Sequence, residues 1–172
     1  MTAPLVVGPL QAYRYWRVDR EGGQPVLRSL YYATPWPAHG PLQAACEAAP
    51  CRLAAWVRQV LSRRGGRRRA PIWGCHCGIY GVSRMDHVEP IAMLPQPQRG
   101  LVVESWPVVG VVSLWGRVIQ HEHGYRAEYA RPLKLCAAPA QVRDRESHAV
   151  IEAVAHRYAI ELVSDVTELT RR

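Results

Sequence analysis

The alternation of apolar and polar residues near the N-terminus predicts a β-hairpin. Residues 13–19 (YRYWRVD) are rich in aromatic side chains and alternate in polarity, which is typical of a half-buried strand. Residues 21–24 (EGGQ) form a turn signal, and residues 25–32 (PVLRSLYY) have the composition of a second strand. Two such strands separated by a glycine-containing turn are expected to pair in antiparallel fashion.

A second hairpin is predicted over residues 108–130. Residues 108–120 (VVGVVSLWGRVIQ) give the strongest strand pattern in the chain, and the turn at 121–124 separates them from a partner strand at 125–130. The first half of this strand is continuously apolar, which indicates that both of its faces are covered. Gly110 and Gly116 indicate a bulge or a close backbone approach within it.

Apolar spacings of three and four predict helices from Leu42 to about Leu61, interrupted at Pro50, and from about Ala140 to Tyr158. Ser83 and Asp86 are placed to cap a shorter helix that runs towards Met93. Short strands are expected after Gly78 and at residues 160–163. The predicted fold is a single α+β domain over residues 1–172, with about three helices. Its sheet is mostly antiparallel and strongly bent, and it is either open or partly closed into a barrel.

Length and composition limit the class of protein. A chain of 172 residues that is 48% hydrophobic can bury a core, so a wholly disordered chain is excluded. No apolar run approaches the roughly 20 residues that a membrane-spanning helix needs. The N-terminal residues lack the basic region and long apolar core of a secretory signal, so we expect a cytoplasmic location without membrane attachment.

The positive charge of the chain is concentrated in one segment. The formal net charge is +8, and five of the arginines lie within seven residues, at Arg63, Arg64, Arg67, Arg68 and Arg69. Paired glycines and like charges predict an exposed loop over residues 62–70. Arginine forks bind phosphates, so this loop is either a nucleic-acid contact or a solvated surface segment. Tyr13, Tyr15, Trp16 and Trp115 are possible stacking residues for bases, although tryptophans are more simply explained as core.

Four of the five cysteines form two close pairs that suit a metal ion. Cys46 and Cys51 are separated from Cys75 and Cys77 by 23 residues. Zinc takes four tetrahedral ligands, mostly sulfur or imidazole nitrogen, so these pairs predict a zinc site, in which His39 or His76 could replace one thiol. The alternative is that Cys46 and Cys51 are small buried apolar residues. Cys136 is expected in the core.

The same residues permit a nucleophilic cysteine. Cys77 lies next to His76, and an imidazole can activate a thiol. Neighbours on an extended strand point to opposite faces, however, so His76 would be poorly placed to deprotonate Cys77.

Two further polar groups have competing interpretations. His121, His123, Arg126 and Glu128 surround one hairpin turn, where they could act as general acid or base or bind an anion; a solvated turn in which Arg126 pairs with Glu128 explains them as well. On the last helix Asp144, His148, Glu152 and His156 recur every four residues. This spacing permits metal binding but is more often the wet face of an amphipathic helix.

Two motifs carry a resemblance to a known family. Residues 75–81 (CHCGIYG), followed by 114–119 (LWGRVI) and 121–128 (HEHGYRAE), resemble a family of small bacterial proteins, mainly from actinobacteria, without an assigned activity. The resemblance extends from the first strand to the last helix. It implies that a cysteine and a histidine precede the Cys-x-Cys pair, whereas this chain has Cys46, Cys51 and the arginine loop there.

Three functions remain open from the sequence. The leading hypothesis is a non-enzymatic binding or adaptor domain with a structural zinc and an acidic partner, nucleic acid ahead of an acidic protein surface. The alternatives are a small hydrolase or transferase that uses the His121–Glu128 hairpin, and a protein-interaction module marked by an apolar patch near Trp36 or Trp73. Motifs of nucleotide-driven and esterase chemistry are absent from the sequence.

Overall fold

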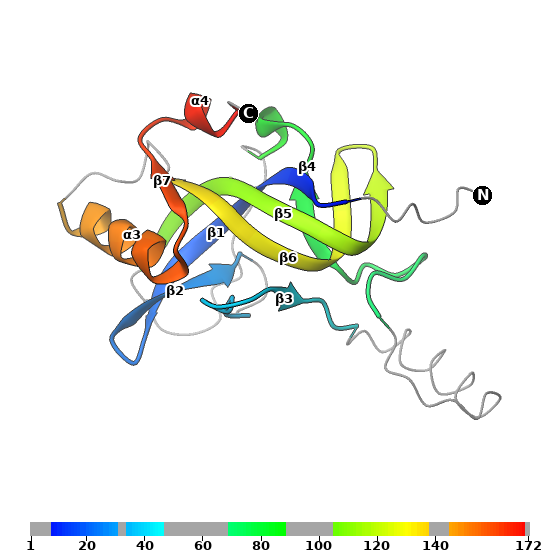
Figure 1. Ribbon diagram of the computed structural model, residues 1–172, viewed down its shortest axis with the longest axis horizontal. Helices are drawn as coiled ribbons and strands as arrows, with labels where there is room; N and C mark the ends of the chain where they lie inside the picture. Colours follow the sequence, from blue (N-terminus) through cyan, green and yellow to red (C-terminus); the bar gives the residue numbers. More distant parts are fainter. Residues whose placement is uncertain (1–7, 31–33, 47–68, 89–104, 138–144, 171–172) are drawn as a thin grey trace.

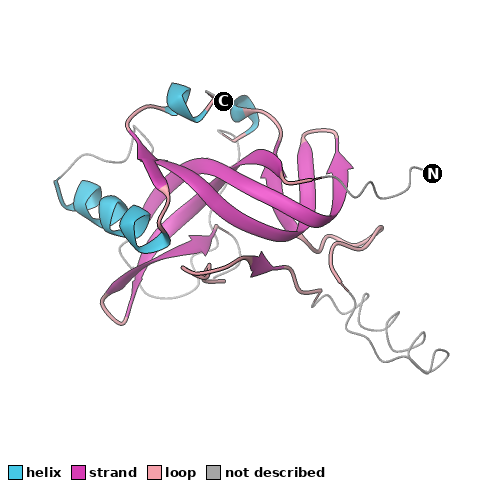
Figure 2. Cartoon of the chain, viewed as in Figure 1, coloured by secondary structure: helices cyan, strands magenta, loops and turns pink. Residues whose placement is uncertain are grey.

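The computed structural model describes residues 8–30, 34–46, 69–88, 105–137 and 145–170 (Figure 1). Seven strands account for about half of these residues: β1 Leu10–Glu21, β2 Gln24–Ser29, β3 Leu42–Gln43, β4 Ile79–Val82, β5 Trp106–His121, β6 Gly124–Ala137 and β7 Glu161–Val163. The described helices are α3 Arg145–Tyr158, α4 Val166–Leu169 and the short 3₁₀ helix η1 Met85–His87 (Figure 2).

The β5–β6 hairpin forms the centre of one bent, mixed sheet. β5 pairs with β6 on one edge and with β1 on the other, and β1 continues into β2, all antiparallel. β7 adds to β6 in parallel. The β5–β6 register shifts between Trp115 and Val118, where Gly116 has a φ of +77°, so the predicted bulge is confirmed there. Both predicted hairpins are present. β1, β5 and β6 are longer than the alternation indicated, whereas β2 spans Gln24–Ser29, within the predicted 25–32 and one residue before it.

The core lies between the sheet and α3. Val150, Ile151, Val154 and Tyr158 of α3 are buried, and the helix covers the end of the sheet that holds the β1–β2 hairpin (Figure 1). The Tyr158 hydroxyl accepts a hydrogen bond from the backbone of Leu27 and donates one to the carbonyl of Trp36, so the helix is anchored by polar contacts as well as by packing.

The outer face of α3 is exposed, as its polar spacing predicted. His148, Glu152 and His156 all lie in solvent, and His148 is within 3.3 Å of Glu152. These residues form the solvent-exposed face of an amphipathic helix. Ala149 is exposed as well, although it is apolar, and Asp144 lies outside the described residues.

The predicted helix from Leu42 is wrong at its start. Leu42 and Gln43 form strand β3 against Ala130 and Tyr129, and the Ala44 amide donates to the carbonyl of Glu128. The alanine-rich sequence favours a helix locally, but the open edge of β6 offers backbone hydrogen bonds that local propensity does not encode. The remainder of that predicted helix, from residue 47, lies outside the described residues.

The other expected features are met in part. The helix predicted after Ser83 is only η1 within the described part, and the Ser83 hydroxyl donates to the carbonyl of His123 instead of capping it. A third α-helix is not confirmed. Neither is a partly closed barrel, since β1 and β4 are joined by one residue pair, Tyr13 with Val82. Among the described residues, no helix has the length and apolar surface needed to span a bilayer.

Candidate metal centre

The site lies where two strands meet end to end along one edge of β6. β3 pairs with Tyr129 and Ala130, and β4 pairs with residues 124–127, so both occupy the edge of β6 that faces away from β5. Both run antiparallel to β6 and therefore in the same direction. The chain that leaves β3 accordingly arrives close to the chain that enters β4, and this topology brings Cys46 towards Cys75 and Cys77.

The sulfur atoms of these three cysteines form a compact group. Cys46, Cys75 and Cys77 place their sulfurs within 4.8 Å of one another, and the Sγ atoms of Cys46 and Cys75 are 3.7 Å apart. Two sulfurs bound about 2.3 Å from one zinc ion at a tetrahedral angle lie about 3.8 Å apart. Cys75 is buried and the other two are half-buried. The group can hold a metal ion.

The turn that carries Cys75 and Cys77 is ordered by its own backbone. The Cys75 amide donates to the carbonyl of Ile72 at 3.1 Å, which closes a turn through Trp73 and Gly74. The Ile72 amide in turn donates to the Sγ of Cys77 at 3.3 Å. A hydrogen bond to sulfur favours the thiolate, which is the metal-binding form.

Arg126 supports the turn from beneath. Its buried guanidinium donates from Nη1 to the carbonyl of Cys75 and, over 3.2 Å, to the carbonyl of Cys77. Gly78 makes this approach possible: its φ is +122°, and a Cβ there would lie 3.0 Å from the Cβ of Pro71 and 3.1 Å from that of Arg126. Arg126 therefore fixes the backbone that presents two of the three sulfurs.

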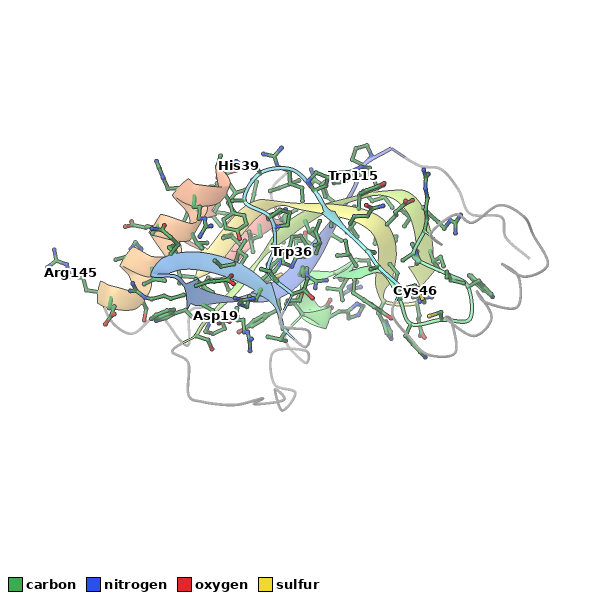
Figure 3. The ribbon with its side chains drawn as sticks, turned by 90° about the horizontal axis from the view of Figure 1, so that it is seen from below. Asp19, Trp36, His39, Cys46, Trp115 and Arg145 are labelled. Atoms are coloured by element: carbon green, nitrogen blue, oxygen red, sulfur yellow. The ribbon has the colours of Figure 1, made fainter. Side chains whose placement is uncertain are left out.

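The expected fourth ligand and its substitutes are placed differently. Cys51 lies outside the described residues. Neither His76 nor His39 contributes an atom to the group of close ligands, and His39 lies well away from Cys46 (Figure 3). The same view places Cys46 at the end of the molecule opposite α3 and Arg145.

The oxidation state of Cys75 bears directly on metal binding. Cys75 carries a disulfide in the structure, whereas Cys46, Cys77 and Cys136 do not, so no disulfide joins any two sulfurs of the group. A metal ion requires thiolates, so the reduced state of Cys75 is the one that could bind it. Cys136 is fully buried, as expected for a core residue, and burial raises the pKa of its thiol.

The polar residues of the β5–β6 hairpin do not converge on one site. The Nε of Arg126 donates to the Nε2 of His121 at 2.5 Å. The His123 ring instead packs edge-on against His87, with 4.7 Å between centroids. The pKa of His121 is lowered, first by burial, then by the charge of Arg126 and by His76.

Glu128 is buried and contacts other residues. Its Oε2 accepts a hydrogen bond from the amide of Arg117 at 3.3 Å, and its Oε1 lies 3.6 Å from the Nε of Arg69. The predicted pairing of Arg126 with Glu128 is wrong, because Arg126 is engaged by the cysteine turn and Glu128 by Arg69.

The arginine segment is described only at its end. The side chain of Arg69 is largely exposed apart from its contact with Glu128, and its carbonyl accepts a hydrogen bond from Arg117. The four preceding arginines, Arg63, Arg64, Arg67 and Arg68, lie outside the described residues.

Among the aromatic residues considered for contacts with a partner, Trp73 is exposed and the others are buried or half-buried. Trp16 and Tyr15 are buried, and so is Trp36, so none of them can offer a ring to a partner. Trp73 is 77% exposed and Tyr80 is 43% exposed. Tyr80 was missed as a surface residue, although its place between the buried residues Ile79 and Gly81 fits strand alternation.

Comparison of the chain with protein-family models, with curated proteins and with solved structures finds no match.

Proposed function

We propose that the chain is a non-enzymatic binding domain stabilised by a structural zinc ion, and that its partner is acidic, with nucleic acid ahead of an acidic protein surface. Cys46, Cys75 and Cys77 would supply three ligands, and Cys51 the fourth. The observation that carries this proposal is the meeting of three sulfurs from segments 29 residues apart at the junction of β3 and β4.

The donor set favours zinc in a structural role. Four thiolates leave no open position for water or substrate, which is typical of structural rather than catalytic zinc. The Ile72 amide donates a hydrogen bond to the Cys77 sulfur, and Arg126 donates one to the Cys77 carbonyl. Hydrogen bonds of this kind orient metal ligands. A bound ion would hold the end of β3 to the start of β4, since β3 itself has only two residues.

The charge distribution supports the acidic partner. The chain has a net charge of +8, and the arginine segment at residues 63–69 lies between the two cysteine pairs in the sequence. Arg69 and Arg117 are exposed, and both contact the buried Glu128, which lies two residues after Arg126 on β6. Arginine side chains displace counterions from phosphates, so binding of this kind weakens steeply with salt.

Metal content tests the zinc site. Tag-free protein, purified under reducing conditions, should contain about one zinc per chain by elemental mass spectrometry. Alanine variants at Cys46, Cys51, Cys75 and Cys77 should each lose it, while Cys136→Ala, a matched cysteine outside the group, should keep it. Thiol titration of native protein should show four cysteines protected until a chelator is added.

The disulfide alternative gives a different result in the same experiment. If reduced protein takes up no metal and all five thiols titrate after unfolding without metal release, the zinc proposal is wrong. In a second case, protein is reduced and kept free of air, and its thiols are titrated. If the thiols lose reactivity only on oxidation, and never on addition of zinc, the cysteines act through a disulfide instead.

Nucleic-acid binding is tested separately. Fluorescence anisotropy with labelled DNA and RNA oligomers at low salt should show binding that weakens as salt is raised. Replacing the five arginines at positions 63–69 with glutamine should reduce both the affinity and its salt dependence. Undetectable binding to every oligomer at low salt would remove nucleic acid as the partner and leave the metal site unaffected.

A further inference from the structure

Two exposed aromatic rings flank the cysteine turn. Trp73, in the turn that precedes Cys75, and Tyr80, on β4 just after Cys77, are the only large apolar side chains that are exposed in the described part of the chain. Exposure of such rings costs free energy in water, and their position on both sides of one turn sets them apart from singly scattered surface residues.

The Tyr80 ring is held in a fixed orientation. Its hydroxyl donates to the carbonyl of His76 at 2.8 Å. His121 stacks against it with 6.5 Å between ring centroids and an interplanar angle of 11°, and the guanidinium of Arg126 lies 5.8 Å from the ring centroid. A ring ordered before binding loses little conformational entropy when a partner stacks on it.

Positive charge lies on the same part of the surface. Arg126 is the cross-strand partner of Tyr80, and Glu128, two residues further along β6, forms an ion pair with Arg69 and accepts a hydrogen bond from the Arg117 amide. The guanidinium groups of Arg69 and Arg117 are exposed, and Arg117 donates to the carbonyl of Arg69. The Arg69 side chain remains 70% exposed beside Glu128, so both cations are open to an anionic partner.

We propose that Trp73 and Tyr80 form a stacking platform for the bases of a single-stranded nucleic acid, with Arg69 and Arg117 contacting its phosphates. This inference rests on the proposed nucleic-acid binding and names the surface that carries it. Exposed rings beside cations suit a single strand, because unpaired bases present their faces for stacking whereas a duplex hides them. Stacking is tolerant of sequence, so little base preference is expected.

Aromatic and charge variants test the platform with labelled single-stranded oligomers of about 12 nucleotides, within the range of common single-strand binding sites. Trp73→Ala and Tyr80→Ala should each weaken binding about tenfold, whereas Trp73→Phe and Tyr80→Phe, which keep a ring, should stay close to wild type. Arg69→Gln and Arg117→Gln should lower the salt dependence, each by about one phosphate contact. A duplex of the same sequence should bind more weakly than the single strand.

Two further variants serve as controls. Arg145→Gln removes an exposed arginine at the opposite end of the molecule (Figure 3), and should leave affinity unchanged. Trp115→Ala removes a half-buried ring that stacks on Tyr129, and should have a smaller effect than Trp73→Ala. Metal content is measured on every variant, so that loss of the cysteine site is not mistaken for loss of stacking.

The outcomes separate the inference from the proposed function. If wild type binds single strands while Trp73→Ala and Tyr80→Ala bind equally well, the platform is wrong and nucleic-acid binding stands. If no oligomer binds, both are wrong, and the exposed rings belong to a protein contact. If Trp73→Ala loses metal, the comparison of Tyr80→Ala with Tyr80→Phe decides.

Discussion

The guanidinium of Arg126 lies 3.2 Å from the carbonyl oxygen of Cys77, so a residue of β6 holds the backbone of a turn that lies 49 positions earlier in the chain. The same nitrogen donates to the carbonyl of Cys75. Both carbonyls therefore share one donor group, which lies on β6. The relationship joins the sheet to the cysteine group, and removal of the guanidinium should disturb both.

Arg126→Met keeps much of the length of the side chain and removes its donors. Leaving buried carbonyls unpaired should lower the free energy of unfolding by about 1–3 kcal/mol. If zinc is bound as proposed, loss of the hydrogen bonds from Arg126 to the carbonyls of Cys75 and Cys77 should weaken zinc affinity about 10- to 100-fold. Urea unfolding and competition with a chromogenic chelator measure the two effects.

Arg145→Met serves as the control for Arg126→Met, because Arg145 is exposed on α3. It should change neither quantity. Equal zinc affinity in Arg126→Met and wild type would show that the hydrogen bonds of Arg126 do not position the ligands.

Gly78→Ala should destabilise the junction of β3 and β4. Its φ of +122° is strained for alanine, and the new Cβ would press on Pro71 and Arg126 at 3.0–3.1 Å. We expect a loss of about 1–3 kcal/mol in the free energy of unfolding, with weaker metal retention. Gly22→Ala, at a φ of +57° with no atom within 4 Å, tests the backbone strain alone and should cost less. An equal loss in both variants would contradict the role of close contacts at Gly78.

The Cys136 thiol should make stability fall at alkaline pH. Burial, followed by the charges of Asp165 and Glu168, raises the pKa of Cys136 in the folded state. As pH rises above about 9, the unfolded chain therefore loses this proton before the folded chain does, and the free energy of unfolding decreases. The difference between wild type and Cys136→Ala, measured by urea unfolding from pH 8 to 11, isolates this contribution from the tyrosines. A difference that does not vary with pH would contradict it.

His121 should contribute to loss of stability on the acid side. Burial, the charge of Arg126 and His76 lower its pKa in the folded state. The unfolded chain thus takes up the proton at higher pH, so this contribution is complete above the usual histidine range and is lost as pH falls through the lowered folded pKa.

His121→Asn should therefore be less sensitive to acid than wild type between pH 7 and 5. His148→Asn, which alters an exposed residue of α3, should follow wild type. Both variants keep every cysteine, so acid-induced metal release is common to all three proteins. A wild-type profile in His121→Asn would show that this residue does not govern the response.

The sequence predicted those parts of the fold that local pattern specifies. The β5–β6 hairpin follows from the apolar run and the turn at Glu122 and His123, and α3 follows from its spacing. β3 could not be predicted, because Leu42 and Gln43 are extended only through pairing with β6. Local propensity carries no information about an edge formed by residues almost 90 positions away.

The sequence allowed the ligand type of the candidate site to be predicted, but not the residues that hold the ligands in place. Cysteine spacing indicated the group of sulfurs that the structure assembles in part. The contacts of Arg126 and Glu128 were not foreseen, since alternation places them on one face but does not say which neighbour each one meets. Likewise the pattern did not show that Trp16 is buried, because its ring packs edge-on against Trp36, which lies 20 positions further along the chain.

The end-to-end placement of β3 and β4 has an evolutionary consequence. Because both strands hold their register on β6, the stretch of chain between them can lengthen or shorten without disturbing a single pairing of the sheet. Doubling the length of a loop costs only about 0.6 kcal/mol in closure entropy. The two ends of such an interval can therefore stay together when its length changes. Insertions and deletions in this interval can therefore accumulate while the paired strands of the sheet stay the same.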